Sequence, residues 1–385
     1  MSTHIVLVAD DLTGALDSVV PFAERGLSTR VAVDTAHIDA ALADNPDILA
    51  INTQSRSEPA TIATARIAAL WDQIASFSPS LVFKKVDSRL KGQVSAEIAA
   101  LLHASGRSEV LACPAAPSLG RVVIAGHVQG HGIDQPISVA ERLGAERLGT
   151  ERLGTGDFPC QIRDARTWED MRDIARTALT YPSRTLVVGA RDLAAAIAER
   201  TMISTASAPA QALRPALPII VAIGSRDPIT QAQIDHLRAH CPDLLDCPAP
   251  DGMVSPPTDR TEAPIILVRA TKGRGNPAPE DVAQRLAMGV AGIMAARQPR
   301  TVLACGGDTA FALAGALDHG VLTPCHELLP GIPFSHFGDH SGMAFIAKSG
   351  GFGSPDALSA IVSLACSAAP RIVPAPAIIP AQVAR

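Results

Sequence analysis

Short runs of apolar residues alternate with longer Ala-rich segments along most of the chain. The first run, IVLV at 5–8, is apolar throughout, which is typical of a parallel strand covered by helices on both faces. The next segment, 13–26, repeats its apolar residues at the spacing of one helical face and ends at Gly26. The pattern therefore predicts a strand followed by a helix over residues 5–26.

The same alternation continues in two series. In the first series, strands are predicted at 30–33, 47–52, 81–86 and 109–113 and helices at 59–77 and 93–104. In the second, strands are predicted at 185–190, 218–225, 264–270, 301–307 and 344–351 and helices at 191–201, 228–240, 280–297, 308–318 and 356–367. Repeated strand–helix–strand units form parallel sheets covered by helices, and ligands bind beyond the carboxyl ends of their strands.

The middle of the chain departs from this alternation. Residues 114–165 are rich in Gly and Pro and contain ERLGA-ERLGT-ERLGT at 141–155, whose period of five fits neither a helix nor a strand. We interpret this repeat as a surface loop, and segments 202–216 and 248–264 as linkers. We therefore predict an α/β protein of two domains, 1–212 and 213–385, each a mainly parallel sheet flanked by helices, with the ligand cleft between them.

Composition narrows the function classes. Of the 385 residues, 47% are hydrophobic and 18% are charged, which excludes a disordered chain. Aromatic residues make up 3% and the net charge is -5, so neither base stacking nor a basic field favours nucleic acid. The seven cysteines include no C-x-x-C pair, which favours a reduced compartment. No apolar run reaches about 18 residues and no basic leader precedes the first strand, so we expect a cytoplasmic protein that does not enter a membrane.

Polar residues follow the predicted strands of the first half. Asp10 and Asp11 stand between the first strand and its helix, where they can accept ligand hydroxyls, act as a general base or simply cap the helix. Arg56 follows the third strand and can bind a carboxylate through two hydrogen bonds, although a plain polar loop has a similar composition. The densest charge cluster is KKVDSRLKG at 84–92. Two lysines inside a strand pattern favour a ligand site there over a solvated strand end.

Glycine-containing turns follow three strands of the second half, at 224–225, 306–309 and 350–351. Such turns expose the backbone N–H groups of a helix N-terminus to an anion. The chain has no Walker A motif, no G-x-G-x-x-G fingerprint and no G-x-S-x-G nucleophile elbow, and its three H-x-x-x-H pairs lack a third ligand at zinc spacing. The turns therefore predict a nucleotide site that uses neither of the two common phosphate loops.

Eight segments, taken in order, resemble one family. They are ADDLTGA (9–15), TQSR (53–56), KKVDSRLKG (84–92), GR (120–121), GSRDPITQAQ (224–233), GGDTA (306–310), PGIPF (330–334) and KSGGFGSPDAL (348–358). Together they resemble the four-carbon acid sugar kinases, which phosphorylate D-threonate, D-erythronate or 3-oxo-tetronate with ATP. The resemblance implies that the N-terminal domain holds the acid sugar and the C-terminal domain holds ATP.

Carried over position by position, the resemblance also implies ligand contacts. The ATP contacts fall on Ser225, Gly306, Gly307, Asp308, Thr309 and Gly350, and the acid-sugar contacts on Asp10, Arg56, Lys85 and Ser88. Arg56 and Lys85 can neutralise the substrate carboxylate. Asp11, and after it Asp87, are the candidates for orienting or deprotonating the acceptor hydroxyl. Mg²⁺ is expected to bind together with ATP, without a metal site made by the protein alone.

The fourth-strand motif of this chain departs from the family pattern. That pattern more often reads DSTLRGN, whereas Arg89, Lys91 and Gln93 stand here in place of its Thr, Arg and Asn. The departure leaves the identity of the acid sugar open.

We predict ATP-dependent phosphorylation of the terminal 4-hydroxyl of a four-carbon acid sugar: D-threonate, D-erythronate or 3-oxo-tetronate. The alternatives are a kinase of another small hydroxy acid or polyol and a catalytically silent nucleotide- or ligand-binding protein. Because aromatic residues are so few, adenine is expected to lie against aliphatic side chains. The sequence is compatible with a homo-oligomer and does not determine the oligomeric state.

Overall fold

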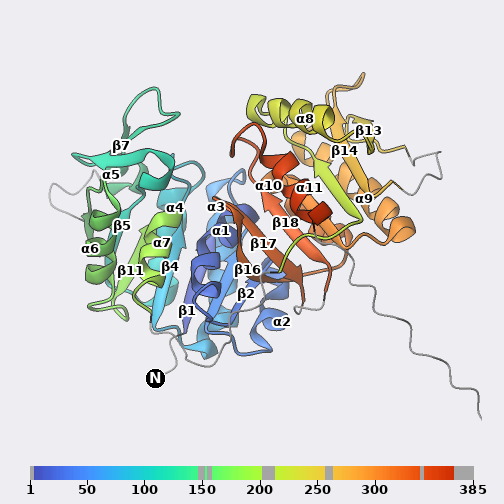
Figure 1. Ribbon diagram of the computed structural model, residues 1–385. Helices are drawn as coiled ribbons and strands as arrows, with labels where there is room; N and C mark the ends of the chain where they lie inside the picture. Colours follow the sequence, from blue (N-terminus) through green and yellow to red (C-terminus); the bar gives the residue numbers. More distant parts are fainter. Residues whose placement is uncertain are drawn as a thin grey trace, which may run out of the picture.

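A computed structural model describes residues 4–145, 152–153, 158–201, 213–255, 263–338 and 342–367. Within them, helices flank one long sheet that runs through both halves of the molecule (Figure 1). The predicted α/β class is confirmed. The predicted domain boundary falls beside residues 202–212, which lie outside the described residues. No described helix is both long and apolar enough to cross a membrane.

The first half forms a parallel sheet. Its strands are β1 (Ile5–Ala9), β2 (Thr29–Ala32), β3 (Ile48–Asn52), β4 (Leu81–Lys85), β5 (Glu109–Cys113), β10 (Phe158–Ile162) and β11 (Thr185–Gly189), with the short β9 (Arg152–Leu153) antiparallel to β10. Its α-helices are α1 (Leu12–Ala23), α2 (Ile38–Leu42), α3 (Ala60–Ile74), α4 (Val94–Ser105), α5 (Val139–Leu143), α6 (Trp168–Ala178) and α7 (Arg191–Ala198). The parallel strands pair in the order β2-β3-β1-β4-β11-β5-β10. Residues of β1 are all buried, as its unbroken apolar run predicts.

A separate antiparallel sheet of three strands is attached to the first half. It consists of β6 (Arg121–Ile124), β7 (His127–Gly130) and β8 (Ile137–Ser138). Helix α5 follows directly, because Ser138 caps it by accepting a hydrogen bond from the Glu141 N–H. The loop interpretation of 141–155 is therefore wrong for the first copy of the repeat, and also for Arg152–Leu153 of the third copy, which form β9. Residues 146–151 and 154–157 lie outside the described residues.

The second half forms another parallel set. Its strands are β12 (Ile219–Ile223), β13 (Leu244–Pro250), β14 (Ile265–Thr271), β15 (Thr301–Cys305), β16 (Val321–Leu329), β17 (Ile332–Phe337) and β18 (Ala344–Lys348). Its helices are α8 (Pro228–His240), α9 (Pro279–Arg297), α10 (Gly307–Ala316) and α11 (Ala357–Ser367). Strands β13-β14-β12-β15-β18 are parallel, and the β17–β16 hairpin continues the sheet in antiparallel pairing. Strand β13 extends into the segment 248–264 that we interpreted as a linker, so that interpretation is wrong for its first residues.

Strand β16 joins the two halves. It pairs antiparallel with β2 through Val321 opposite Ala32 and Leu322 opposite Val31. The two parallel sets therefore run in opposite senses along one sheet. Residues that follow the carboxyl ends of β1 and β15 nevertheless line the same cleft, among them Asp11 and Asp308, as expected for a sheet whose strands twist by about 20–25° each. Helix α1 packs against α10 beside that cleft.

Candidate active site

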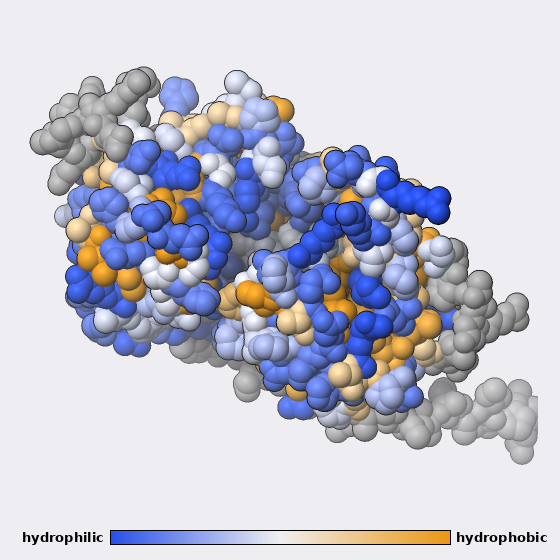
Figure 2. Space-filling model, turned by 90° about the horizontal axis from the view of Figure 1, so that it is seen from above, coloured by the Kyte–Doolittle hydropathy of each residue, from blue (hydrophilic) through white to orange (hydrophobic). Residues whose placement is uncertain are grey.

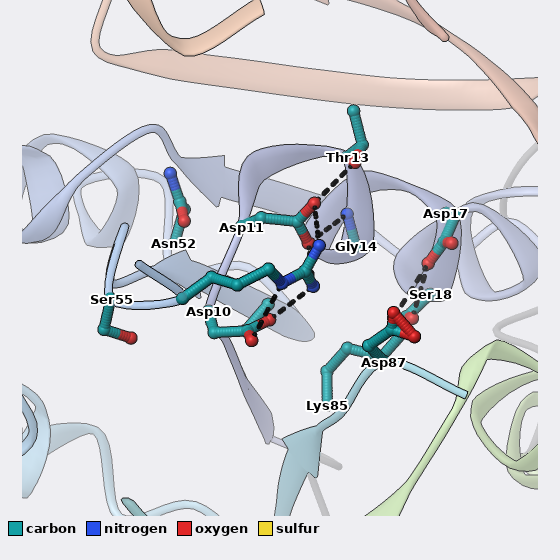
Figure 3. Close-up of polar contacts among 12 residues, drawn as sticks. Asp10, Asp11, Thr13, Gly14, Asp17, Ser18, Asn52, Ser55, Lys85 and Asp87 are labelled. Carbon is teal, nitrogen blue, oxygen red and sulfur yellow. Dashed lines mark hydrogen bonds and ion pairs between the residues drawn. The ribbon is translucent and has the colours of Figure 1, made fainter. Parts of the chain in front are cut away.

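A guanidinium group joins the two aspartates that follow β1. Nε and Nη2 of Arg56 donate to the carboxylate of Asp10 at 3.0 and 2.7 Å, and Nη1 and Nη2 donate to that of Asp11 at 2.8 Å each. The loop after β3 is held in place because the Arg56 N–H also donates to the backbone oxygen of Asp10 at 3.3 Å. Figure 3 shows Asp10 and Asp11 side by side with these hydrogen bonds dashed. The structure thus brings three predicted site residues into one cluster.

Asp11 also caps helix α1. Its carboxylate accepts hydrogen bonds from the Gly14 N–H at 3.0 Å and from Oγ1 of Thr13 at 2.7 Å. A Cβ on Gly307, the first residue of α10, would lie 3.4 Å from Oδ2 of Asp11. The N-terminus of a second-half helix therefore reaches this first-half carboxylate.

The two lysines at the end of β4 differ in their surroundings. Lys84 is fully buried and forms an ion pair with Glu97 at 3.2 Å, and Ser55 donates to the same carboxylate at 2.5 Å. Lys85 lies toward Asp17, with 3.8 Å between Nζ and Oδ1. Of the two lysines in the strand pattern, Lys84 therefore belongs to the core and Lys85 to the cleft.

Lys85 lines a cavity of about 360 Å³, called here the Lys85 cavity. Other predicted site residues around it are Asp11, Arg56, Asp87 and Ser88. Asp10 lies outside its lining and contacts it through Arg56.

The Lys85 cavity also contains charged residues that sequence reasoning did not select. They are Asp17, Arg89, Lys91, Arg121, Arg191 and Asp227. Arg191 is the first residue of α7 and pairs with Glu327 of β16 at 2.5 Å. The two residues lie far apart in the sequence, so no local pattern predicts this contact. Arg121 and Asp227 lie in the family segments at 120–121 and 224–233, and Arg89 and Lys91 lie in the charge cluster at 84–92, but the sequence assigned no ligand contact to any of them.

The glycine turns of the second half enclose another cavity of about 360 Å³, the Ser225 cavity. All six predicted nucleotide residues line it: Ser225, Gly306, Gly307, Asp308, Thr309 and Gly350. A Cβ on Gly350 would lie 2.2 Å from Oγ of Ser225, and one on Gly224 would lie 2.1 Å from Oγ1 of Thr309. A side chain at either position would collide with a hydroxyl group that lines the cavity, so the close approach of these turns requires glycine.

Aliphatic residues form a wall of the Ser225 cavity. Pro277, Pro279 and Val282 line it, and no aromatic side chain appears among its described lining residues. The buried Lys348 holds the turn that contains Gly350, because its Nζ donates to the backbone oxygens of Ser349 at 2.9 Å and Gly350 at 3.4 Å. Burial lowers the pKa of Lys348.

A central cavity of about 810 Å³ connects the two others. It shares Asp11 and Arg56 with the Lys85 cavity and Gly307 and Asp308 with the Ser225 cavity. Seen from above, the molecular surface is hollowed between its two halves (Figure 2). The three cavities therefore form one path across the cleft, with Asp11 beside the meeting point.

Burial and pairing set the ionisation of the cluster. Burial alone would raise the pKa of Asp10, but Arg56, Lys84 and Lys85 outweigh it and hold that pKa below its usual value. Burial, with Glu280 and Asp11 nearby, raises the pKa of Asp308. Within the described part of the chain, no three His, Cys, Asp or Glu residues gather closely enough to hold a metal ion by themselves.

Comparisons with known proteins agree with this division. Residues 5–142 match a family described as a sugar-binding N-terminal domain, and residues 220–358 match one described as a nucleotide-binding C-terminal domain. D-threonate kinases of Salmonella typhimurium and Bordetella bronchiseptica are 27% and 29% identical to this chain, over 92% of it and 96% of each relative. A 3-oxo-tetronate kinase of Burkholderia multivorans is 25% identical over 91% of this chain and 94% of its own.

Solved structures share the fold. A Salmonella typhimurium LT2 protein matches with a TM-score of 0.69 and 20% identity, covering 93% of this chain and 98% of that one. The Haemophilus influenzae protein HI1011 matches with a TM-score of 0.65 and 18% identity, covering 94% and 100%. With full-length kinase relatives and both domain families in the expected order, the chain belongs to the four-carbon acid sugar kinase family.

Proposed function

We propose that this sugar-acid kinase transfers the γ-phosphoryl group of ATP to the 4-hydroxyl of a four-carbon acid sugar bound in the Lys85 cavity. The observation that carries the proposal is the approach of Gly307 to Asp11, at 3.4 Å from a Cβ on Gly307 to Oδ2 of Asp11. An acceptor hydroxyl beside Asp11 would face phosphates held at the N-terminus of α10. Phosphoryl transfer depends mainly on such positioning and on charge neutralisation.

The Ser225 cavity fits a nucleotide. Its glycine turns leave room for phosphate oxygens, and the N-terminal N–H groups of α10 favour an anion. Asp308 is the one carboxylate among the described residues that line this cavity, so it would hold the Mg²⁺ that arrives with ATP. That Mg²⁺ would neutralise phosphate charge. Pro277, Pro279 and Val282 offer adenine an aliphatic surface.

Residues of the Lys85 cavity receive the acid sugar in this proposal. Asp11 orients or deprotonates the acceptor hydroxyl, since it borders both the central and the Lys85 cavities, whereas Asp87 borders only the latter. Arg56 fixes the direction of both aspartates through four N–H groups. Lys85 and Ser88, which also line this cavity, would bind the remaining polar groups of the substrate.

The test is ADP release from Mg·ATP with a panel of acceptors. D-threonate comes first, because curated relatives carry that name, followed by D-erythronate, 3-oxo-tetronates, their L-isomers and neutral tetritols. We expect turnover of one tetronate, with phosphate on O4 by phosphorus NMR. Preference for a tetritol would favour a polyol kinase. Nucleotide binding without turnover of any acceptor would favour a silent binding protein and overturn the proposal.

A further inference from the structure

Two arginines of the Lys85 cavity approach the same turn. Arg89 lies in the loop after β4, and Arg121 is the first residue of β6 in the small sheet. A Cβ on Gly132, between β7 and β8, would lie 2.4 Å from Nη2 of Arg89 and 3.9 Å from Nη2 of Arg121. Both guanidinium groups therefore lie near Gly132, and both arginines line the Lys85 cavity.

Neither arginine has a carboxylate partner among the described residues. Arg121 donates from Nε to the backbone oxygen of His131 at 3.0 Å and from Nη1 to Oγ of Ser88 at 2.7 Å, both of them neutral acceptors. Nε of Arg89 is buried and has no hydrogen-bond partner in the described part of the chain. Asp87 receives the backbone N–H of Arg89 at 2.7 Å, and it forms no ion pair with either guanidinium group.

Three other cations of the Lys85 cavity are paired. Arg56 is held by Asp10 and Asp11, Lys85 lies 3.8 Å from Asp17, and Arg191 pairs with Glu327 at 2.5 Å. Of the five N–H groups of a guanidinium, Arg56 gives four to the two aspartates, which leaves it one for a ligand. Lys91, the remaining cation of the cavity, is exposed and offers a single ammonium group. Binding both oxygens of an anion through one side chain therefore falls to Arg89 and Arg121.

Two adjacent cations that lack carboxylates are electrostatically costly. Burial, and after it the neighbouring Arg89, lowers the pKa of Arg121, while Asp87 offsets part of this effect from a distance. A bound carboxylate would relieve the repulsion and give Nε of Arg89 its acceptor. Arginine is well suited to this, since its planar donors match both oxygens of a carboxylate.

We infer that Arg89 and Arg121 form the subsite for the carboxylate of the acid substrate and determine the preference for an acid over a neutral polyol. The inference rests on the proposed function. With the carboxylate at this pair, the other end of the four-carbon chain is free to lie beside Asp11. Arg56 then acts mainly as a positioning residue for Asp10 and Asp11.

The variants Arg89→Gln and Arg121→Gln test this subsite in the full-length protein. We expect KM for the turned-over tetronate to rise about 10- to 100-fold in each, as for the loss of a charged hydrogen bond. The KM of the matching neutral tetritol and the KM of ATP should stay within threefold. Arg176→Gln is the control, since it removes a positive charge from an exposed arginine of α6 that lines none of the three cavities, and its tetronate KM should change less than threefold.

Parallel losses for the tetronate and the tetritol would show that the arginines only brace the cavity, and unchanged tetronate KM would show that they do not contact the substrate; either result overturns the inference. Thermal unfolding verifies that each variant folds. If Arg121→Gln does not fold, Arg89→Gln carries the test, because no hydrogen bond from its side chain is lost within the described structure.

Failure of the carboxylate subsite can be told apart from failure of the proposed kinase function. If the wild type turns over no tetronate, the proposed function fails, and calorimetric titration of D-threonate and of the matching tetritol into the wild type and both variants decides the subsite. Binding of D-threonate that is weakened at least tenfold in both variants, with tetritol binding unchanged, supports it. Absence of D-threonate binding to the wild type overturns it.

Discussion

The Lys85 cavity and the Ser225 cavity have the same volume, about 360 Å³, but different kinds of side chain line them. Ten charged side chains are among the described residues that line the Lys85 cavity, and four of them are paired with one another, Asp11 with Arg56 and Asp17 with Lys85. The described lining of the Ser225 cavity contains two charged side chains, Arg226 and Asp308, among glycines and small or aliphatic residues. In the first, a ligand must replace or complement existing ion pairs. In the Ser225 cavity, a ligand occupies the space that glycines leave open because they carry no side chain. Substitutions should therefore act through charge in one cavity and through volume in the other.

Asp11→Asn should have the largest effect, because it removes charge where the cavities meet. Asn still caps a helix, so we expect a folded protein whose kcat falls about 10²- to 10⁴-fold, with KM for ATP within threefold, measured by coupled ADP release. Asp164→Asn is the control, since Asp164 lines none of the three cavities and accepts hydrogen bonds from the N–H groups of Ala125 and Gly126 at 2.6 and 2.9 Å. Equal kcat in the Asp11 variant and the wild type would remove Asp11 from the chemistry.

Glu97→Gln tests how much the buried ion pair between Lys84 and Glu97 contributes to the stability of the fold. It leaves Lys84 without its counter-charge in the core, and we expect a loss of about 3–5 kcal/mol in the free energy of unfolding, measured by urea titration. Glu58→Gln breaks the partly exposed pair with Arg66 at 2.8 Å and should cost about 1 kcal/mol or less. Equal losses for both variants would mean that burial does not set the strength of these pairs.

Gly350→Ala should act by volume alone. The new methyl group would lie 2.2 Å from Oγ of Ser225 and 2.9 Å from its Cβ, so Ser225 must move. Overpacking of this kind corresponds to a rise of at least about tenfold in KM for ATP, while KM for the acid sugar stays within twofold. Steady-state kinetics with each substrate varied in turn measures both. A larger effect on the acid sugar would break the division between the cavities.

Gly315→Ala should have the smallest effect and the opposite sign. Gly315 lies in α10, the same helix whose first turn borders the Ser225 cavity, and a Cβ there would have no atom within 4 Å. Reduced freedom of the unfolded chain should stabilise the protein by about 0.4–1 kcal/mol, with unchanged KM for ATP. Destabilisation in urea titration would show that glycine is needed in α10 beyond its first turn.

The two cavities also differ in how many of their lining residues could be predicted from the sequence. Glycine turns were found from the sequence because a turn after a strand is a local pattern, and Ser225, Gly306 and Gly350 do line one cavity. The partners of charged residues were not local. Glu97 of α4, which neutralises Lys84, carries no mark of burial in its helix pattern, so both lysines looked like ligand residues.

The parallel strands were predicted because burial on both faces requires continuous apolar runs. The β16–β17 hairpin was missed because Pro324, His326 and Glu327 interrupt the apolar run of β16. Arg121 and Arg191 could not be placed in the Lys85 cavity, because only the folding of the small sheet and the crossing from α7 to β16 bring them there.

The pairing of β16 with β2 has a mechanical consequence for the cleft. Two domains connected only by a loose segment can swing apart as rigid bodies, but here a hydrogen-bonded ladder at Val31 and Ala32 spans the junction. In the proposed function, opening wide enough to admit a nucleotide would then be absorbed as a change of twist in the strands beside this ladder. The elasticity of a few strands at the middle of the sheet, more than the freedom of any loop, is expected to set how fast the cleft opens.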